Sequence, residues 1–189
     1  MHNVFIHETA IVDQPIIIGE GTKIWQWVYI ISGAKIGKDC VLGQNVYVGG
    51  KAVLGSNVRV QNNVSIYDRV ILADDVFSGP SMVFTNVINP RSSVERKHEY
   101  LETHTGRGTI IGANATIICG NKIGEYAFIG TGCLVSKSVP GYALLLGNPA
   151  KQMGWMSSAG IRLEFDEDGI ALCGETGERY EKLKIKSPI

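Results

Sequence analysis

Apolar residues recur with a period of six through most of this chain. Between residues 6 and 84 an aliphatic or aromatic side chain occupies every sixth position, and only Ser78 departs from the rule. After an interruption, the same pattern runs from residue 111 to residue 135. The residue four places later in each hexad is usually small or β-branched. The hexad positions are Ile6, Val12, Ile18, Ile24, Ile30, Ile36, Leu42, Val48, Leu54, Val60, Ile66, Leu72, Ser78, Phe84, Ile111, Ile117, Ile123, Ile129 and Val135.

A six-residue repeat predicts a solenoid of short strands. Three strands make one coil of about eighteen residues, and coils stack about 4.8 Å apart, the ordinary spacing of paired strands. The apolar residue and the small residue four places later should point inward, so that each coil buries its side chains on the next. A glycine often follows the apolar residue, and we expect it to supply a positive φ at a corner. The predicted fold class is therefore all-β, a parallel β-helix. The pattern does not decide its handedness, since parallel crossovers are usually right-handed.

The register breaks once, between Phe84 and Ile111, whose separation is not a multiple of six. The intervening segment is rich in charged residues and turn formers, so about residues 87–108 should leave the solenoid as an excursion loop. Long loops in compact domains are usually functional or disordered. The position of this loop, in the middle of the solenoid, favours a functional one.

The chain divides into two predicted parts, residues 1–154 and 155–189. The first is the β-helix with its excursion loop. The second holds two alternating runs, 161–165 and 170–173, separated by Asp166–Gly169. An Asp-Gly turn between alternating runs predicts a small β-hairpin. We expect this hairpin to cap the solenoid or to pack in an oligomer.

Composition narrows the function classes. The 189 residues carry 18 Lys and Arg against 18 Asp and Glu, a net charge of zero, so the basic footprint of a nucleic-acid-binding protein is missing. Neither a secretory signal nor an apolar run of membrane-spanning length is found. The four cysteines form no CxxC pair, and Cys40 and Cys133 take the small position of their hexads, where a thiol acts as a small hydrophobe. We expect a cytoplasmic protein without nucleic-acid or membrane partners.

Several segments carry a resemblance to known enzymes. The closing segment 138–152, with Gly-Asn-Pro-Ala-Lys at 147–151, resembles the hexapeptide-repeat acyltransferases that use acetyl-CoA. Segments 61–68, 79–87, 89–91 and 94–97 are similar to the nucleotide-linked 3-amino-sugar N-acetyltransferases, and most of all to those acting on UDP-2-acetamido-3-amino-2,3-dideoxy-glucuronate. The similarity extends over nearly the whole chain. It implies left-handed coiling, acetyl-CoA as co-substrate and no metal. It further implies a homotrimer with active sites between subunits, and a role in surface polysaccharide (O-antigen) synthesis.

The histidines bear on the type of acyl transfer. A hydroxyl acceptor needs a general base, most often His, yet His2 and His7 belong to the first coil, where solvation or capping explains them better. His98 and His104 fall within the predicted loop, and their participation is left open. An amine is partly unprotonated at neutral pH and can react through proximity and oxyanion stabilisation. The proton can leave with the CoA sulfur. The sequence therefore favours N-acylation without an obligatory protein base.

The candidate acceptor residues cluster around the start of the loop. Asp68 and Asn86 are eighteen residues apart and should be vertical neighbours on adjacent coils. By resemblance, Asn86 positions the amino sugar or the reacting carbonyl; for Asp68, an Asn/Asp ladder or a turn cap is an equally good interpretation. Asn62, Asn63 and Tyr67 are candidates for nucleotide or sugar contacts, with solvated turn residues as the alternative.

The loop arginines and the end of the solenoid supply further candidates. A guanidinium pairs bidentately with carboxylate or phosphate. We assign Arg96 to a sugar carboxylate and Arg91 to the diphosphate or to anchoring of the loop, although a charged loop is often merely solvated. The residues that the resemblance assigns to CoA are Gly130, Thr131, Gly132, Lys137, Asn148, Pro149 and Lys151.

Two alternatives stay beside this interpretation, and a third function is set aside. A dTDP-linked 3-amino-3,6-dideoxyhexose is the second candidate substrate. A γ-type carbonic anhydrase shares the solenoid but needs three His ligands on adjacent coils, which this sequence lacks. A non-catalytic hexapeptide scaffold would need neither the Gly-Asn-Pro-Ala-Lys segment nor the loop.

Overall fold

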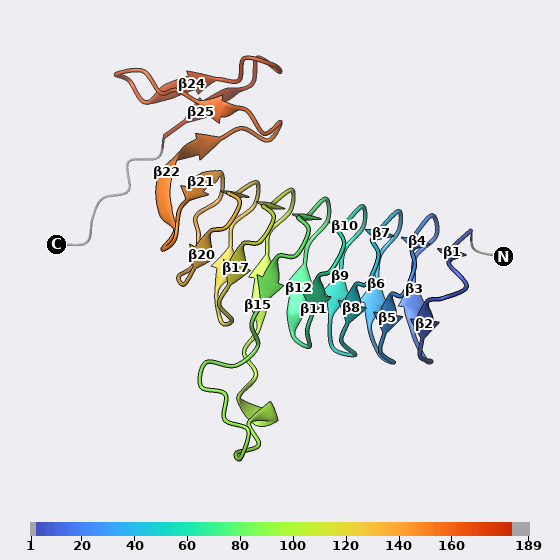
Figure 1. Cartoon of the computed structure of the whole chain (residues 1–189). Helices are drawn as coiled ribbons and strands as arrows, with labels where there is room; N and C mark the ends of the chain where they lie inside the picture. The colour runs from blue at the N-terminus through green and yellow to red at the C-terminus, as the bar shows by residue number, and fades with distance from the viewer. Residues whose placement is uncertain (1–2, 183–189) are drawn as a thin grey trace.

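The computed structural model describes residues 3–182 as a solenoid with a side loop and a terminal layer (Figure 1). The strands are two to six residues long, and the helical content of this range is one 3₁₀ turn, η1 (Lys97–Glu99). No helix among these residues is long and apolar enough to cross a bilayer. The excursion loop and the C-terminal strands project from opposite edges of the solenoid.

Three sheets form the walls of the solenoid, and each full coil contributes one strand to each sheet. Sheet A contains β1 (Phe5–Ile6), β4 (Lys23–Ile24), β7 (Val41–Leu42), β10 (Arg59–Val60), β13 (Phe77–Ser78), β16 (Ile110–Ile111), β19 (Phe128–Ile129), β21 (Ala143–Leu146), β22 (Lys151–Met156) and β23 (Arg162–Leu163). Sheet B contains β2 (Ile11–Val12), β5 (Tyr29–Ile30), β8 (Tyr47–Val48), β11 (Ser65–Ile66), β14 (Val83–Phe84), β17 (Thr116–Ile117) and β20 (Leu134–Val135). Sheet C contains β3 (Ile17–Ile18), β6 (Lys35–Ile36), β9 (Val53–Leu54), β12 (Val70–Leu72), β15 (Thr103–Thr105) and β18 (Lys122–Ile123).

The strand register confirms the six-residue repeat. Residues eighteen positions apart pair in parallel, as Tyr29 does with Tyr47, and from β4 onward the hexad positions of the regular coils are buried. The residues four places later are buried as well, except Asn121. They are Thr22, Val28, Ala34, Cys40, Val46, Ala52, Val58, Val64, Val70, Val76, Met82, Thr109, Ala115, Ala127 and Cys133. The fold is thus the predicted parallel β-helix of hexapeptide repeats, consistent with the left-handed coiling that the resemblance implied.

The glycines that follow the hexad positions do not supply the positive φ that we expected. None of them has a positive φ; the left-handed residue lies two places later, as at Asn45 (φ 59°) and Asn57 (φ 58°). A Cβ on Gly79 would lie 2.7 Å from the backbone nitrogen of Ala113 in the next coil. These glycines are therefore required by the close approach of successive coils, and not by turn conformation.

The excursion loop ends earlier than the predicted boundary at about residue 108. β15 pairs with β12 on one side and with β18 on the other, so sheet C resumes at Thr103. The loop is therefore the segment 85–102, between β14 and β15. In the coil that carries it, Thr105 takes a buried hexad position together with Ser78 and Phe84. Because Thr105 is not apolar, the six-residue pattern of apolar residues did not show that the solenoid resumes before residue 111.

The C-terminal strands pair differently from the predicted hairpin. The turn at Asp166–Gly169 is present, and the amide of Gly169 donates to the carbonyl of Asp166 (3.0 Å). However, β23 pairs with β22, while β24 (Ile170–Leu172) pairs with β25 (Arg179–Glu181). The antiparallel hairpin therefore lies one element later in the chain than we predicted, and the run at 161–165 extends sheet A instead.

Candidate functional site

The excursion loop leaves the solenoid at the corner between sheets B and C, which we call the B/C corner. Asp68, Asn86, Cys119 and Lys137 stand in one column of this corner, because each lies three residues after the paired strand positions of β11, β14, β17 and β20. Adjacent members are about 4.8 Å apart along the solenoid axis. Asn86 and Lys137 are therefore two coils apart on the same corner.

The base of the loop is fixed to the coils on both sides. The amide of Leu101 donates to the carbonyl of Asn86 (3.0 Å), which closes the base. The guanidinium of Arg69, in the coil below, donates to the carbonyl of Tyr100 (2.7 Å). The carbonyl of Glu102 accepts the amide of Gly120 in the coil above (3.1 Å). Among residues 3–182 the half-buried side-chain amide of Asn86 has no hydrogen-bond partner.

Asp68 has a structural task at this corner. Its Oδ1 accepts the backbone amide of Lys51 in the preceding coil (3.1 Å). The equivalent residue on the preceding corner, Asn62, accepts the amide of Gln44 in the same way (3.0 Å). These contacts support the turn-cap interpretation that we had set beside a ligand role for Asp68, and they extend it to Asn62.

Tyr67 belongs to an aromatic ridge beside the B/C corner. Its ring lies 6.0 Å from that of Tyr47, and Tyr47 lies 6.1 Å from Tyr29. Burial raises the pKa of Tyr47, and the negative charge of Asp68 raises it further. The Tyr47 phenol is therefore a hydrogen-bond donor at neutral pH.

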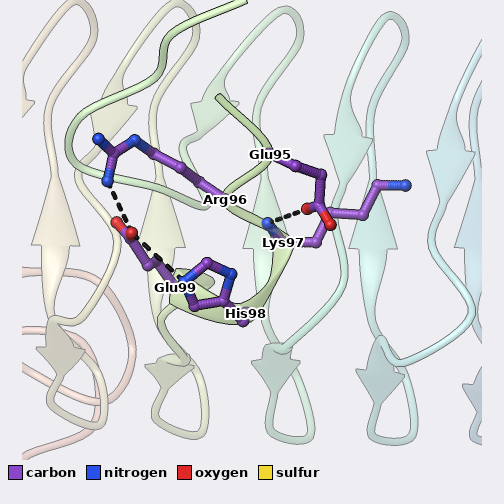
Figure 2. Close-up of polar contacts among 5 residues, drawn as sticks. All are labelled: Glu95, Arg96, Lys97, His98 and Glu99. Carbon is purple, nitrogen blue, oxygen red and sulfur yellow. Dashed lines mark hydrogen bonds and ion pairs between the residues drawn. The ribbon is translucent and has the colours of Figure 1, made fainter. Parts of the chain in front are cut away.

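The structure brings Arg91 and Arg96 together in the loop. Both line a cavity of about 330 Å³. Arg96 is already paired, with Nη1 only 2.6 Å from Oε1 of Glu99, and the same carboxylate oxygen lies 3.5 Å from Nε2 of His98 (Figure 2). The Nε of Arg96 is buried without a partner among the described residues. Arg91 is exposed and donates only to the carbonyl of Pro90 (3.3 Å). Arg91 is thus the more accessible cation, whereas an anion reaching Arg96 must compete with Glu99.

A second cavity lies further along the B/C corner, toward the C-terminal end of the solenoid. It has a volume of about 400 Å³, and its lining includes Lys137, Pro149 and Lys151. These are three of the residues that the resemblance assigned to CoA, and two of them are cations suited to phosphate groups. Asn148 is exposed and precedes Pro149 in the chain, but it does not line this cavity.

The remaining candidates lie on the corner between sheets A and B, the A/B corner. Residues 130–132 follow β19 there, and Asn62 and Asn63 follow β10. Gly130 packs against Leu146, since a Cβ would lie 2.5 Å from Leu146 Cδ2. Gly132 has φ 70° and open space around it. Asn63 accepts a hydrogen bond from Asn45 (3.1 Å). A single chain does not bring these residues to the cavity of Lys137.

Sequence reasoning missed two residues, one in the excursion loop and one at the B/C corner. Glu99 lies three positions after Arg96, a spacing at which side chains on a helical turn meet, so its pairing with Arg96 had a detectable signal. Cys119 lies between Asn86 and Lys137 in the column, and it could be placed only once the end of the loop was known. Its amide is held by Oγ1 of Thr85 (2.9 Å).

Comparison with known proteins identifies the family. A family model described as bacterial transferase hexapeptide (six repeats) matches residues 15–50, and one described as hexapeptide repeat of succinyl-transferase matches residues 33–68. The dTDP-3-amino-3,6-dideoxy-alpha-D-galactopyranose 3-N-acetyltransferase of Aneurinibacillus thermoaerophilus is 39% identical over 177 residues, which cover 94% of this chain and 90% of the relative. This chain belongs to the hexapeptide-repeat acyltransferases.

A second relative and a solved structure are also similar to this chain. A chloramphenicol acetyltransferase of Agrobacterium fabrum is 41% identical over 91 residues, which cover 47% of this chain and 40% of the relative. The acetyltransferase domain of PglB from Neisseria gonorrhoeae, solved in complex with acetyl coenzyme A, shares the fold with a TM-score of 0.53. It is 21% identical, and the match covers 80% of this acyltransferase and 58% of that domain. In residues 3–182, no group of three or more His, Cys, Asp or Glu side chains is placed to hold a metal ion.

Proposed function

We propose that this acyltransferase transfers acetyl from acetyl-CoA to the 3-amino group of a nucleotide-linked amino sugar. The observation that carries the proposal is the B/C corner, on which Asn86, the loop cavity of Arg91 and Arg96, and the lysine cavity lie within a few coils of one another. An amino-sugar nucleotide near the loop and an acetyl-CoA extending from Lys137 would meet beside Asn86. The 39% identical relative, a sugar 3-N-acetyltransferase, supports the same acceptor class.

The proposed reaction needs little acid–base chemistry from the protein. The free amine attacks the thioester carbonyl carbon, the new C–N bond forms, and the C–S bond breaks. The proton from nitrogen leaves with the CoA sulfur, so the products are an amide and a thiol. Asn86 hydrogen-bonds the sugar or the developing oxyanion and holds the two reactants in line. His98 and His104 are each paired with a glutamate at the loop or its base, and no step requires them.

The distribution of the candidate residues favours active sites between the subunits of a homotrimer. The A/B corner carries Asn62 and Asn63 at the height of Asp68, and residues 130–132 at the height of Lys137, because these residues belong to the same coils. A symmetry axis parallel to the solenoid keeps equal heights together. When the A/B corner of one copy lies against the B/C corner of the next, Asn62 and Asn63 would therefore face the sugar-binding part of the site. Residues 130–132 would face Lys137 in the CoA-binding part.

Two nucleotide-linked amino sugars are candidates for the acetyl acceptor. The two arginines of the loop cavity would suit a UDP-linked 2-acetamido-3-amino uronate, whose carboxylate and diphosphate are both anions. The Aneurinibacillus relative favours a dTDP-linked 3-amino-3,6-dideoxyhexose instead. We rank the uronate first because the loop cavity holds two guanidinium groups. Either product would serve surface polysaccharide synthesis.

The test is a thiol-release assay with acetyl-CoA and a panel of UDP- and dTDP-linked amino sugars. Release that depends on a 3-amino sugar, and is absent with the matching hydroxyl sugar, would support the proposal. Replacing Asn86 with Ala should lower kcat by about a hundredfold, in the range of losing one oxyanion donor. Arg96→Ala should cripple a uronate substrate and spare a 6-deoxy one. No release with any amino sugar would overturn the proposed function, and equal losses for both sugars would overturn the carboxylate assignment.

A further inference from the structure

A third cavity lies at the corner between sheets C and A. Its volume is about 550 Å³, within the range of small-molecule sites. It is formed between the last coil of the solenoid and the strands of the C-terminal layer. In Figure 1 that layer and the excursion loop extend from opposite edges of the solenoid. The cavity adjoins the lysine cavity at Pro140 but contains none of the candidate residues of the acyl-transfer site.

Aromatic rings form much of its wall. Tyr142, Trp155, Phe165 and Tyr180 all line it. The rings of Tyr142 and Tyr180 meet at 64° with centroids 5.8 Å apart, so they present two differently inclined surfaces. Tyr142 is also stacked on Tyr126 from behind, with centroids 5.2 Å apart, which fixes its orientation.

The charged groups of this cavity are three carboxylates, Glu125, Glu178 and Glu181, and two cations, Arg179 and Lys182. Glu125 and Glu178 line the cavity, and in residues 3–182 neither forms a salt bridge. Glu181 is different, since it lies 3.9 Å from Arg179. Hydrogen bonds from Tyr180 and Ser158 lower the pKa of Glu178 and keep it ionised at neutral pH. The cavity thus combines aromatic faces with two carboxylates that lack a cationic partner.

The negative charges of Glu125 and Glu178 affect the aromatic wall at Tyr142. Burial raises the pKa of Tyr142, and Glu125 and Glu178 add to the rise. Both carboxylates therefore lie close enough to act on the same phenol ring. The faces of aromatic rings attract cations, and the attraction strengthens when the cation is removed from water. Beside Tyr142, where Glu125 and Glu178 lie, an organic cation would be stabilised by the ring and by the carboxylates.

We propose that this cavity is a second ligand site that binds an alkylammonium compound, with its cationic group against Tyr142, Trp155 and Tyr180 and its counter-ions at Glu125 and Glu178. The two carboxylates without an ion pair, Glu125 and Glu178, favour a cation over a neutral apolar ligand at this wall. Its lining contains no residue of the Asn86 column, so variants of this site leave those candidate residues intact.

The test compares choline with its neutral isostere 3,3-dimethylbutan-1-ol by titration calorimetry on the full chain. Choline should bind about tenfold more tightly, as expected for a desolvated cation over aromatic rings. Glu178→Gln should reduce choline affinity several-fold and leave the isostere unchanged. Tyr142→Phe keeps the ring and should retain choline binding, whereas Tyr142→Ala should lose it.

Trp25→Leu is the matched control, because Trp25 is exposed at the other end of the solenoid. It should leave choline affinity unchanged, and acetyl transfer by the Glu178 and Tyr142 variants verifies that each is folded. Equal affinities for choline and the isostere, no saturable binding, or the same loss in Trp25→Leu would overturn the proposal. The outcome does not depend on which sugar the enzyme acetylates.

Discussion

At the scale of single residues, the hexad contains two positions with opposite demands on the backbone. The glycine after the hexad position must be small because the next coil lies against it, as Gly112 shows with a Cβ position 2.6 Å from the nitrogen of Thr131. The residue two places later must adopt a left-handed conformation, which Asn57 and Asp75 do at φ 58° and 60°. Asn and Asp tolerate that conformation better than other side chains. The sequence showed which residue types recur at the two positions. The structure shows that close packing of the coils requires the glycine, whereas a positive φ favours Asn or Asp.

Gly79→Ala tests the close-approach explanation. The added methyl meets the backbone of Ala113, which cannot move without shifting a coil, so we expect a loss of about 1–3 kcal/mol in the free energy of unfolding. Urea unfolding followed by circular dichroism measures it. Gly174→Ala is the control, because Gly174 has no neighbour within 4 Å and no positive φ. If both variants were as stable as the parent, the coils would not be in tight contact.

Glu99→Gln tests the competition for Arg96. The Arg96–Glu99 pair is partly exposed, with side-chain accessibilities of 29% and 38%, and such pairs contribute about 0.2–1 kcal/mol. Removing the negative charge should therefore lower KM for a uronate substrate by at most about fivefold, without changing KM for a 6-deoxy sugar. Glu95→Gln is the matched control, since Glu95 accepts only the amide of Lys97 (2.6 Å). A higher KM for the uronate would show that Glu99 helps to hold the sugar.

At the scale of elements, the long insertion must not loosen the coil that carries it. Asp75 lies before the loop and Arg107 after it, and their side chains meet with Oδ2 2.9 Å from Nε. Asn57 donates to the other oxygen of Asp75 (2.8 Å) from the preceding coil. Three coils are thereby connected at the corner between sheets C and A, away from the loop.

This connection predicts a pH dependence of stability. The hydrogen bonds from Asn57 and Arg107 lower the pKa of Asp75 below its ordinary value of 3.8. A lowered pKa means that the carboxylate stabilises the fold fully above pH 3.8 and loses this contribution as pH falls through the folded-state value. The stability difference between the parent and Asp75→Asn should therefore be largest near neutrality and shrink in acid. Asn keeps the left-handed backbone, and denaturant unfolding from about pH 7 to about pH 3 measures the difference. A constant difference would contradict the assignment.

The same elements show what sequence could and could not reveal. The repeat predicted the walls of the solenoid and the start of the loop, because burial on both sides of each coil forces an apolar residue into every hexad. It misplaced the end of the loop, because buried hydroxyl residues, Ser78 and Thr105, take two of the hexad positions in that coil. It also recognised the turn at Asp166–Gly169 but not the strand partners, because several short runs of similar pattern compete for pairing.

At the scale of the whole molecule, the predicted site is divided between two corners. Sequence could name Asn62, Thr131 and Lys137 as candidates, but their separation onto the A/B and B/C corners became visible only from the strand order. Within one chain, the sheet between them keeps the A/B and B/C corners of the solenoid apart. Assembly of identical copies can bring the A/B corner of one copy to the B/C corner of the next. Cyclic symmetry then keeps residues of the same coil at the same height along the solenoid axis.

Mixing two inactive variants tests whether active sites form between subunits. Thr131→Arg should block the A/B corner and Lys137→Glu should remove a phosphate-binding charge from the B/C corner, so each alone should lose most acetyl transfer. In randomly mixed trimers, about a quarter of the interfaces would combine an intact A/B corner with an intact B/C corner. Thiol release should then recover to about a quarter of the parent rate after unfolding and joint refolding. Mixing the variants without subunit exchange is the control and should recover nothing. If each site were contained in one chain, joint refolding would restore no activity, because every chain would still carry one damaged corner.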